Sequence, residues 1–371
     1  MTLRVPFMTL GPGPDAAAVR EAIDRVIERG WFILGPELSA FEEEFAAASG
    51  ARHAVGVGTG TDAIALTLRA LGIGPGDEVI TSPLSAAFSA LAIMMAGATP
   101  VFADIDPDRL TIAPDTVEAA ITAKTAAILP VHLYGQPADM ATLTPIARRH
   151  NLAIVEDACQ AHLATCAGRP VGTFGAAGAF SFYPTKNLGA IGDGGAVITS
   201  DDALADRLRR LRNGGQAERY QHVEFGVNSR LDELQAAVLR ARLPRLAGHT
   251  DRRRTLARRY RAALEESPVH VPPLCDSGHV HHLFPVRVAD RVGFMAHLND
   301  CGIGTLIHYP TPIHRQPAFA GMGAPSCPVA DRVAAEVCSL PFHPGLTNED
   351  VEFVASHVRA WRPAATGGRV R

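Results

Sequence analysis

Lysine is scarce in this chain, and one of its lysines stands where imine chemistry would need it. Of the 35 lysine and arginine residues, only Lys124 and Lys186 are lysine. Lys186 lies in the loop 183–189, directly after a predicted strand. A lysine amine can lose its proton and form an imine with a carbonyl compound, which an arginine cannot. Loop lysines are usually surface residues, but the nearby hydroxyls of Ser181 and Thr185 suit a phosphate and favour a chemical role.

A carboxylate follows another predicted strand. Asp157 comes directly after the predicted strand 152–156. Because the carboxyl ends of parallel strands meet at one edge of a sheet, we expect Asp157 close to Lys186. A carboxylate there could keep a pyridine nitrogen protonated and make the ring an electron sink. Taken alone the motif is weak, since aspartate is also a frequent helix N-cap.

A glycine-rich turn supplies the third chemical element. The residues Val-Gly-Thr-Gly-Thr-Asp-Ala at 57–63 follow a predicted strand and open a helix. Free backbone amides at a helix start bind phosphate, although many α/β proteins use such a turn merely as a connection. Together, the three elements predict a phosphate cradle, a ring-nitrogen partner and an imine-forming amine at one sheet edge.

The elements that must position these groups alternate along the chain. We predict a large α/β domain over residues 1–245 and a smaller α+β domain over residues 246–371. Expected strands are 54–57, 78–81, 100–103, 126–131, 152–156, 179–182 and 196–199, with helices at 62–70, 86–96, 114–121, 140–150 and 202–212. Two long helical patterns between 228 and 265 bridge to a strand at 282–288 and helices at 294–301 and 348–361.

The composition excludes several classes of protein. The 371 residues are 47% hydrophobic and carry a formal net charge of -3, so we expect neither nucleic acid nor an anionic membrane as a partner. The most apolar stretch, 90–103, is interrupted by Gly97 and Pro100, so no transmembrane helix is expected. The N-terminus lacks the features of a secretory signal, so no export is expected. The six cysteines and the histidines at 279, 281 and 282 lack metal-ligand spacing, so no metal is expected. A cytoplasmic location is predicted.

The lysine loop also resembles a known family. The run Ser-Phe-Tyr-Pro-Thr-Lys-Asn-Leu-Gly at 181–189, followed by Gly-Asp-Gly-Gly-Ala at 192–196, resembles the DegT/DnrJ/EryC1/StrS family of sugar aminotransferases. The stretches 30–37, 72–79, 226–235 and 302–310 are similar to the family as well, so the resemblance covers almost the whole chain. It implies an α/β fold of the pyridoxal-phosphate-dependent transferase type I, with a mostly parallel sheet covered by helices.

The resemblance also assigns roles to individual residues. It implies that Lys186 carries pyridoxal 5'-phosphate as a Schiff base and moves the proton between the two imine carbons. It places Asp157 on the ring nitrogen and Gln160 near the ring hydroxyl. The phosphate ligands would be Gly60, Thr61 and Ser181, with Asn228 reaching the phosphate from the neighbouring subunit of a homodimer with shared sites.

One position departs from the family. Many relatives place an aromatic ring over the cofactor at the position of Ala86, and this chain has Phe88 two residues further on. What stacks on the cofactor ring is therefore open.

For the substrate pocket we predict Tyr183, His308, Tyr309 and His314, although tyrosines and histidines at a domain interface are often only packing residues. The expected reaction moves an amino group from glutamate or glutamine to a nucleotide-linked keto-deoxysugar. A dTDP sugar is favoured, and the forms of 228–232 and 308–310 favour its third carbon over the fourth. Amination of a cyclitol ketone and a non-catalytic cofactor-binding regulator remain alternatives. A sugar dehydratase is disfavoured, because such relatives replace the lysine with histidine.

Overall fold

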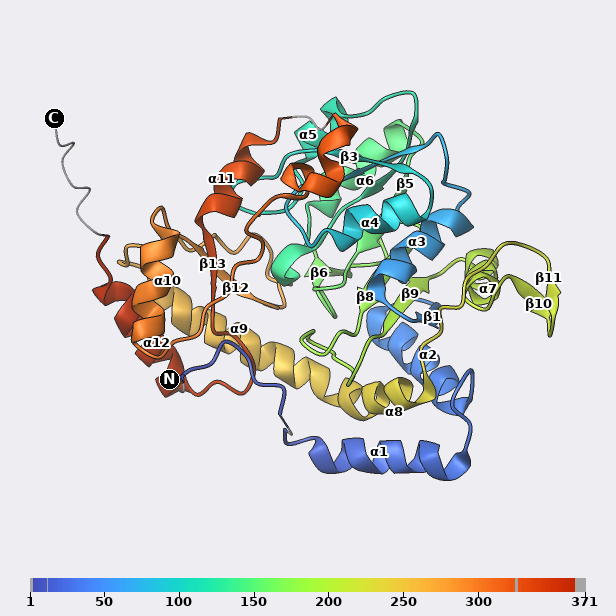
Figure 1. The fold of residues 1–371 in the computed structure, drawn as a ribbon, viewed down its shortest axis with the longest axis horizontal. Helices are drawn as coiled ribbons and strands as arrows, with labels where there is room; N and C mark the ends of the chain where they lie inside the picture. The colour runs from blue at the N-terminus through green and yellow to red at the C-terminus, as the bar shows by residue number, and fades with distance from the viewer. Residues whose placement is uncertain (1–2, 12, 324–325, 364–371) are drawn as a thin grey trace.

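A seven-stranded sheet forms the centre of the molecule. The computed structural model describes residues 3–11, 13–323 and 326–363 (Figure 1). The strands follow the order β1-β9-β8-β5-β4-β2-β3, and β9 alone runs antiparallel to its neighbours. They are β1 (His53–Val57), β2 (Glu78–Thr81), β3 (Thr99–Phe102), β4 (Thr125–Leu129), β5 (Ala153–Asp157), β8 (Ala177–Ser181) and β9 (Gly195–Thr199). Each of the seven expected strands is present, and no strand end differs from its expected position by more than two residues.

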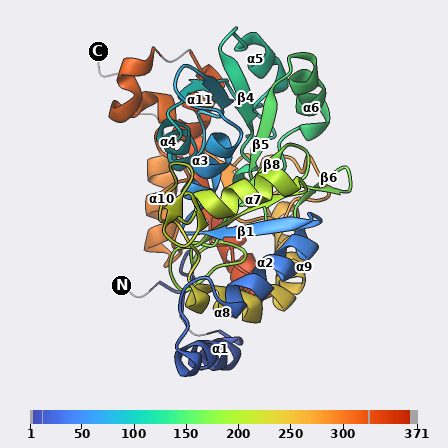
Figure 2. The same cartoon turned by 90° about the vertical axis from the view of Figure 1, so that its right-hand side faces the viewer.

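Helices cover both faces of this sheet because neighbouring strand residues point to opposite sides. Val79 and Val155 join a core with one set of helices, whereas Ile80 and Ile154 join a core on the other face. The first face is covered by α3 (Gly60–Ala70), α4 (Phe88–Met95) and α7 (Asp202–Leu211), and the second by α2 (Pro36–Ser49), α5 (Pro114–Ala119) and α6 (Met140–Arg149). Figure 2 shows α7 and α2 on opposite sides of β1.

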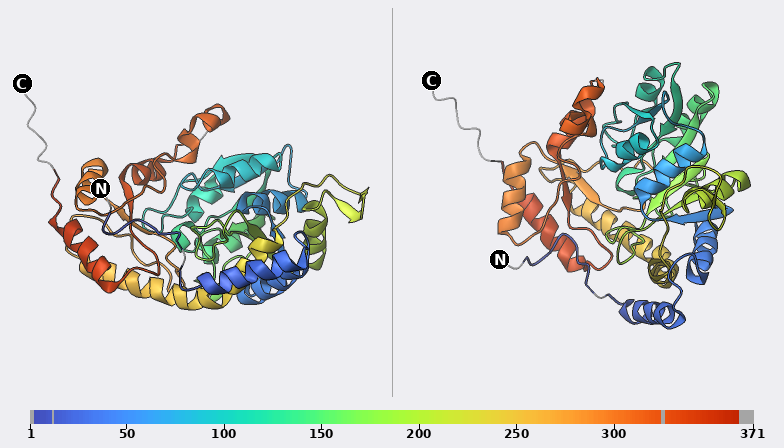
Figure 3. Two further views of the ribbon diagram at one scale, coloured as in Figure 1. Left: turned by 60° about the horizontal axis from the view of Figure 1, so that its bottom comes forward. Right: turned by 45° about the vertical axis from the view of Figure 1, so that its right-hand side comes forward.

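A pair of helices leads from the large sheet to the C-terminal elements. α8 (Glu233–Arg242) continues through the 3-10 segment Leu243–Arg245 into α9 (Leu246–Ala263), and the two run along one side of the molecule (Figures 1 and 3). The N-terminal helix α1 (Ala16–Arg29) packs on α8 through Ala22, Val26 and Ala237.

The C-terminal elements form a second core around α9. The strands β12 (Phe284–Arg287) and β13 (Val337–Leu340) pair antiparallel, and α10 (Arg291–Asp300), α11 (Pro328–Glu336) and α12 (Asn348–Ala360) accompany them. Leu256 and Tyr260 of α9 pack there with Phe294 and Val354, and Val5 joins them beside Ile303. The division of the chain between residues 245 and 246 stays a prediction.

Short elements complete the described chain. They are β6 (Thr165–Cys166), β7 (Arg169–Pro170), the hairpin β10 (Gln216–Glu218) and β11 (Gln221–His222), and the 3-10 segments Leu133–Gly135, Ile313–Arg315 and Pro317–Met322. The hairpin β10-β11 projects beyond α7 at the right of Figure 1. Among the described residues, no helix has the length and apolar character needed to cross a membrane.

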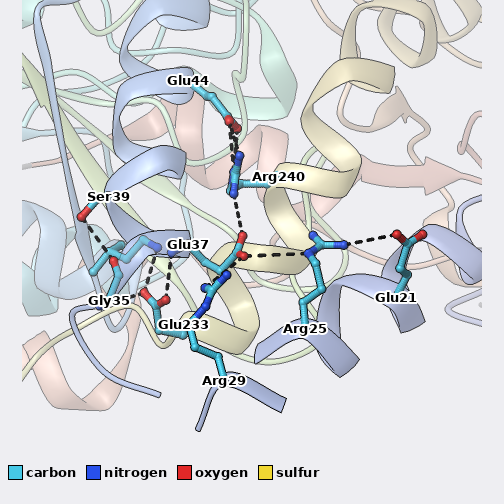
Figure 4. Close-up of polar contacts among 10 residues, drawn as sticks. Glu21, Arg25, Arg29, Gly35, Glu37, Ser39, Glu44, Glu233 and Arg240 are labelled. Carbon is cyan, nitrogen blue, oxygen red and sulfur yellow. Dashed lines mark hydrogen bonds and ion pairs between the residues drawn. The ribbon is translucent and has the colours of Figure 1, made fainter. Parts of the chain in front are cut away.

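The N-terminus of α2 is capped by a carboxylate from far along the chain. Glu233, fully buried, accepts hydrogen bonds from the backbone amides of Gly35 (3.0 Å), Glu37 (2.8 Å) and Leu38 (2.8 Å) (Figure 4). A negative charge at a helix N-terminus satisfies otherwise unpaired amides and opposes the positive end of the helix dipole. Glu233 thereby fixes the segment before α2 onto the start of α8.

Candidate active site

A pocket of about 470 Å³ lies at the carboxyl ends of the central strands. Asp157 ends β5 and Ser181 ends β8, while the turn after β1 leads into α3. Among the residues lining the pocket are those predicted on the large sheet, Gly60, Thr61, Asp157, Gln160, Ser181, Tyr183 and Lys186, and the C-terminal pair His308 and Tyr309. Most of the predicted site residues therefore meet in one cavity.

The loop that carries Lys186 is a tight turn with fixed geometry. The amide of Lys186 donates to the carbonyl of Tyr183 (2.8 Å). A Cβ atom at Gly189 would lie 2.5 Å from the carbonyl oxygen of Pro184, so a larger residue would push the loop open. The loop holds Lys186 at the pocket wall instead of leaving it in solvent.

The environment of Lys186 lowers the pKa of its amine. Burial lowers the pKa of Lys186, and the nearby Cys159 and Asp157 oppose this shift only in part. A lower pKa increases the fraction of unprotonated amine, the form that attacks a carbonyl carbon. Burial also raises the pKa of the Cys159 thiol, with a further contribution from Asp157, so this thiol stays protonated.

The carboxylate of Asp157 is held by both of its oxygens. The hydroxyl of Ser89 donates to Oδ2 (2.7 Å), and the amide of Cys159 donates to Oδ1 (3.2 Å). The next element after β5 is the strand β6, so Asp157 is not the helix cap that its position after a strand also allowed. Ser89, in the first turn of α4, was missed by the sequence reasoning, because no local pattern links it to Asp157.

The start of α3, which also lines the pocket, is suited to a phosphate. α3 begins at Gly60, and the hydroxyl of Thr59 accepts from the amide of Asp62 (3.0 Å) as its N-cap. A Cβ atom at Gly60 would lie 2.7 Å from the sulfur of Cys159 and 2.8 Å from Cβ of Ser181. The close approach that only glycine permits brings the helix start and the hydroxyl of Ser181 together, as an anion site requires.

The wall from the C-terminal part is tied to the large sheet. The side-chain amide of Gln160 donates to the hydroxyl of Tyr309 (3.1 Å). Burial raises the pKa of Tyr309 to about 12, although the hydrogen bond from Gln160 opposes that shift. Burial, followed by the charge of Lys186, lowers the pKa of His308 to about 4. Both side chains are thus uncharged hydrogen-bonding groups at neutral pH.

Two predicted residues lie outside this pocket. His314 is buried beside the ring of Phe102, with its Nε2 3.2 Å from Asp331, and does not line the cavity. Asn228 is exposed, pairs by backbone with Asn213 and does not line the pocket of its own chain. It does not cap α8, whose N-cap is Asp232. Its role in a neighbouring subunit stays a prediction.

The pocket contains both residues that bear on stacking over the cofactor ring. Ala86 and Phe88 both line the pocket, and the side chain of Phe88 is 61% exposed. Ala86, at the position where the resemblance expects an aromatic ring, has a small side chain that leaves room in the pocket. The exposed side chain of Phe88 lies where the pocket opens to solvent. Thr59, Asp193 and His282 also line the pocket and were not predicted from the sequence.

These groups fit pyridoxal phosphate. A half-buried lysine amine, an oriented carboxylate and a helix start with hydroxyls surround a cavity of the size that small ligands occupy. The model of the DegT/DnrJ/EryC1/StrS aminotransferase family matches residues 15–359. The chain belongs to this family. It is a pyridoxal-phosphate-dependent aminotransferase with the predicted type I fold.

Individual relatives match over nearly their whole length. The chain is 50% identical, over 97% of both sequences, to a dTDP-3-amino-3,4,6-trideoxy-alpha-D-glucose transaminase of Streptomyces venezuelae. It is 44% identical to a UDP-N-acetyl-3-dehydro-alpha-D-glucosamine 3-aminotransferase of Acidithiobacillus ferrooxidans, over 91% of this chain and 92% of that one. A crystal structure of S. venezuelae DesV in complex with a ketimine intermediate superposes with a TM-score of 0.95 at 49% identity, covering 98% of this chain and 100% of that one.

Proposed function

We propose that this aminotransferase moves an amino group from glutamate or glutamine to the third carbon of a dTDP-linked keto-deoxysugar. The observation that carries the proposal is the pocket that joins Lys186 to Asp157, in a chain half identical to a transaminase of that substrate class. The motifs at 228–232 and 308–310 favour the same carbon. The second relative acts at the third carbon of a UDP sugar, so it supports the position of amination more than the nucleotide.

The residues divide the work along the pocket. Pyridoxal phosphate, when bound, supplies a ring that takes up the electrons released at the reacting carbon. Nζ of Lys186 would anchor the cofactor and would take and return the proton at that carbon. Asp157, oriented by Ser89, would hold the proton on the ring nitrogen. Gly60, Thr61 and Ser181 would bind the phosphate, and Gln160 would recognise the ring hydroxyl.

The acceptor side of the pocket is formed by Tyr183, His308 and Tyr309. Because His308 and Tyr309 are neutral at physiological pH, they recognise sugar hydroxyl groups by hydrogen bonds and not by charge. Tyr183, the first residue of the lysine loop, is 51% exposed, so an incoming sugar would meet it first.

The enzyme is proposed to act as a homodimer with shared sites. Asn228 is exposed and does not line its own pocket, which supports a role in the partner's site. Exposed apolar side chains, Trp31 (54%) and Phe225 (93%), supply surface for such an interface. Co-expression of Lys186→Ala with Asn228→Ala chains tests the sharing. Mixed dimers regain activity only if Asn228 serves the opposite site, since one site is then intact.

The substrate assignment is tested with a panel of keto acceptors. Purified enzyme is incubated with glutamate or glutamine and with 3-keto and 4-keto sugars of dTDP and UDP, or with a cyclitol ketone, and the products are weighed by mass spectrometry. The proposal expects the aminated dTDP 3-keto sugar as the fastest product. A cyclitol amine as the main product would contradict the proposal and would indicate a cyclitol aminotransferase instead. Cofactor binding without any half-reaction with an amino donor would instead indicate a regulator.

A further inference from the structure

A buried tyrosine outside the pocket contacts several of the residues that line it. Tyr134 lies in the 3-10 segment after β4 and is 2% exposed. Its backbone φ is 59°, in the left-handed region that side-chain-bearing residues rarely adopt. Such a conformation costs conformational energy and persists where the surrounding contacts determine it. The contacts of Tyr134 must therefore stabilise this conformation.

Three of those contacts reach pocket residues. The amide of Tyr134 donates to Oε1 of Gln160 (2.7 Å), and its carbonyl accepts from the amide of His282 (2.8 Å). Its hydroxyl donates to the carbonyl oxygen of His308. Gln160 in turn donates from Nε2 to the hydroxyl of Tyr309 (3.1 Å), so the contacts form a closed ring between the large sheet and the segment 308–309.

The left-handed backbone is what makes this ring possible. It turns the amide of Tyr134 toward Gln160 while its side chain reaches His308. The amide fixes which end of the Gln160 side chain faces Tyr309, because an amide oxygen that accepts from Tyr134 leaves the NH₂ group to donate. On the other side of the segment, His308 is within hydrogen-bond distance of the hydroxyl of Ser339 (3.0 Å).

We infer that Tyr134 is a positioning residue that sets where His308 and Tyr309 stand relative to the cofactor side of the pocket. The inference deepens the proposed function and rests on it for the acceptor sugar. Removal of the hydroxyl in Tyr134→Phe frees the carbonyl of His308, and the acceptor then meets a less ordered wall. We expect the KM for the keto sugar to rise about tenfold, the effect of one lost hydrogen bond. The spectrum of bound cofactor should not change.

Tyr260→Phe is the matched control. Tyr260 is also fully buried, and its hydroxyl donates to a backbone carbonyl, that of Pro341 (3.1 Å), within the C-terminal core. The two variants remove the same atom and one comparable hydrogen bond. A merely structural contribution would lower the melting temperature in both and would leave the KM for the acceptor unchanged in both.

A second readout needs no substrate. Hydrogen-deuterium exchange of peptides spanning 305–313 reports on the order of the segment, whose amides at Leu306 and Ile313 bond to Ser339 and Pro83. Faster exchange there in Tyr134→Phe, and not in Tyr260→Phe, supports the inference. Exchange equal to wild type, the same changes in both variants, or a changed cofactor spectrum with an unchanged KM overturns it. If the wild type aminates no keto sugar, the proposed function fails, whereas the exchange comparison still decides the positioning.

Discussion

Loss of the Ser89 hydroxyl should slow the chemical step without emptying the pocket. In Ser89→Ala, Oδ2 of Asp157 loses its donor at 2.7 Å, and the amide of Cys159 on Oδ1 remains. The hydroxyl of Ser85 lies 3.2 Å from that of Ser89 and forms no described contact with Asp157. The carboxylate then has one hydrogen-bonded oxygen instead of two, so it can rotate more freely and is less well aligned with the ring nitrogen.

The size of the effect follows from the type of bond. A hydrogen bond from a neutral donor to a carboxylate contributes about 1.5 to 3 kcal/mol. Each 1.36 kcal/mol at the transition state is a factor of about ten in rate. If the bond acts mainly while charge develops on the ring, the rate constant for the half-reaction with glutamate should fall about 10- to 100-fold. Affinity for the cofactor should change little, since the lysine and phosphate contacts are intact.

Stopped-flow absorbance of the cofactor measures this rate constant in a single turnover. Ser89→Thr keeps a hydroxyl and should retain most of the rate. Thr81→Val is the control for a lost buried hydroxyl, because Thr81 donates to the carbonyl of Leu129 (2.9 Å) within the sheet. A Ser89→Ala rate within twofold of wild type would refute the reasoning, as would an equal loss in Thr81→Val.

Three other outcomes follow from the same contacts. Lys186→Ala should abolish both the visible absorbance of lysine-bound cofactor and transamination, which spectra and product assays check. Glu233→Gln should lower the free energy of unfolding by about 2 to 4 kcal/mol, measured in urea, because three backbone amides lose a charged acceptor. Burial lowers the pKa of His162 and His281 to about 3 and that of His308 to about 4. These histidines stay neutral when folded but protonate near pH 6.5 when unfolded, so stability is full above pH 6.5 and is lost as the pH falls toward 4. The free energy of unfolding, measured in urea, should be lower at pH 5 than at pH 7.5 by about 1 to 2 kcal/mol per histidine.

The sheet and its helices could be predicted because their signals are local. Strands buried on both faces appear as continuous apolar runs, and the turns between them carry glycine and proline. The helices α1, α2 and α11 were missed, although α2 and α11 both begin with a proline, which favours the first position of a helix. α1 and α2 precede the first expected strand and α11 lies in the C-terminal part, outside the alternation of strands and helices on which the prediction rested.

The site could be predicted where the sheet itself dictates proximity. Asp157 and Ser181 end adjacent parallel strands, so the topology alone brings them and the loop of Lys186 to one edge. His314 shows the limit of this reasoning. It follows Tyr309 by five residues, yet the intervening turn carries it to Phe102. No local sequence pattern identifies Tyr134, because its role depends on a left-handed backbone and on contacts with residues far along the chain.

The structure also explains why two distant stretches of the chain carry motifs of the family. Glu233 caps the helix that begins after Gly35, and its amide donates to the carbonyl of Phe32 (3.0 Å), so 30–38 and 232–235 form one unit. Two residues further along α8, Gln235 accepts from the amide of Ile191 (3.0 Å), just beyond the lysine loop. At the end of the same helix, Arg242 donates to the carbonyl of Gly189 (2.6 Å). α8 therefore fastens the N-terminal segment and the loop of the reactive lysine to one helix, which makes the geometry of the site depend on residues that do not line the pocket.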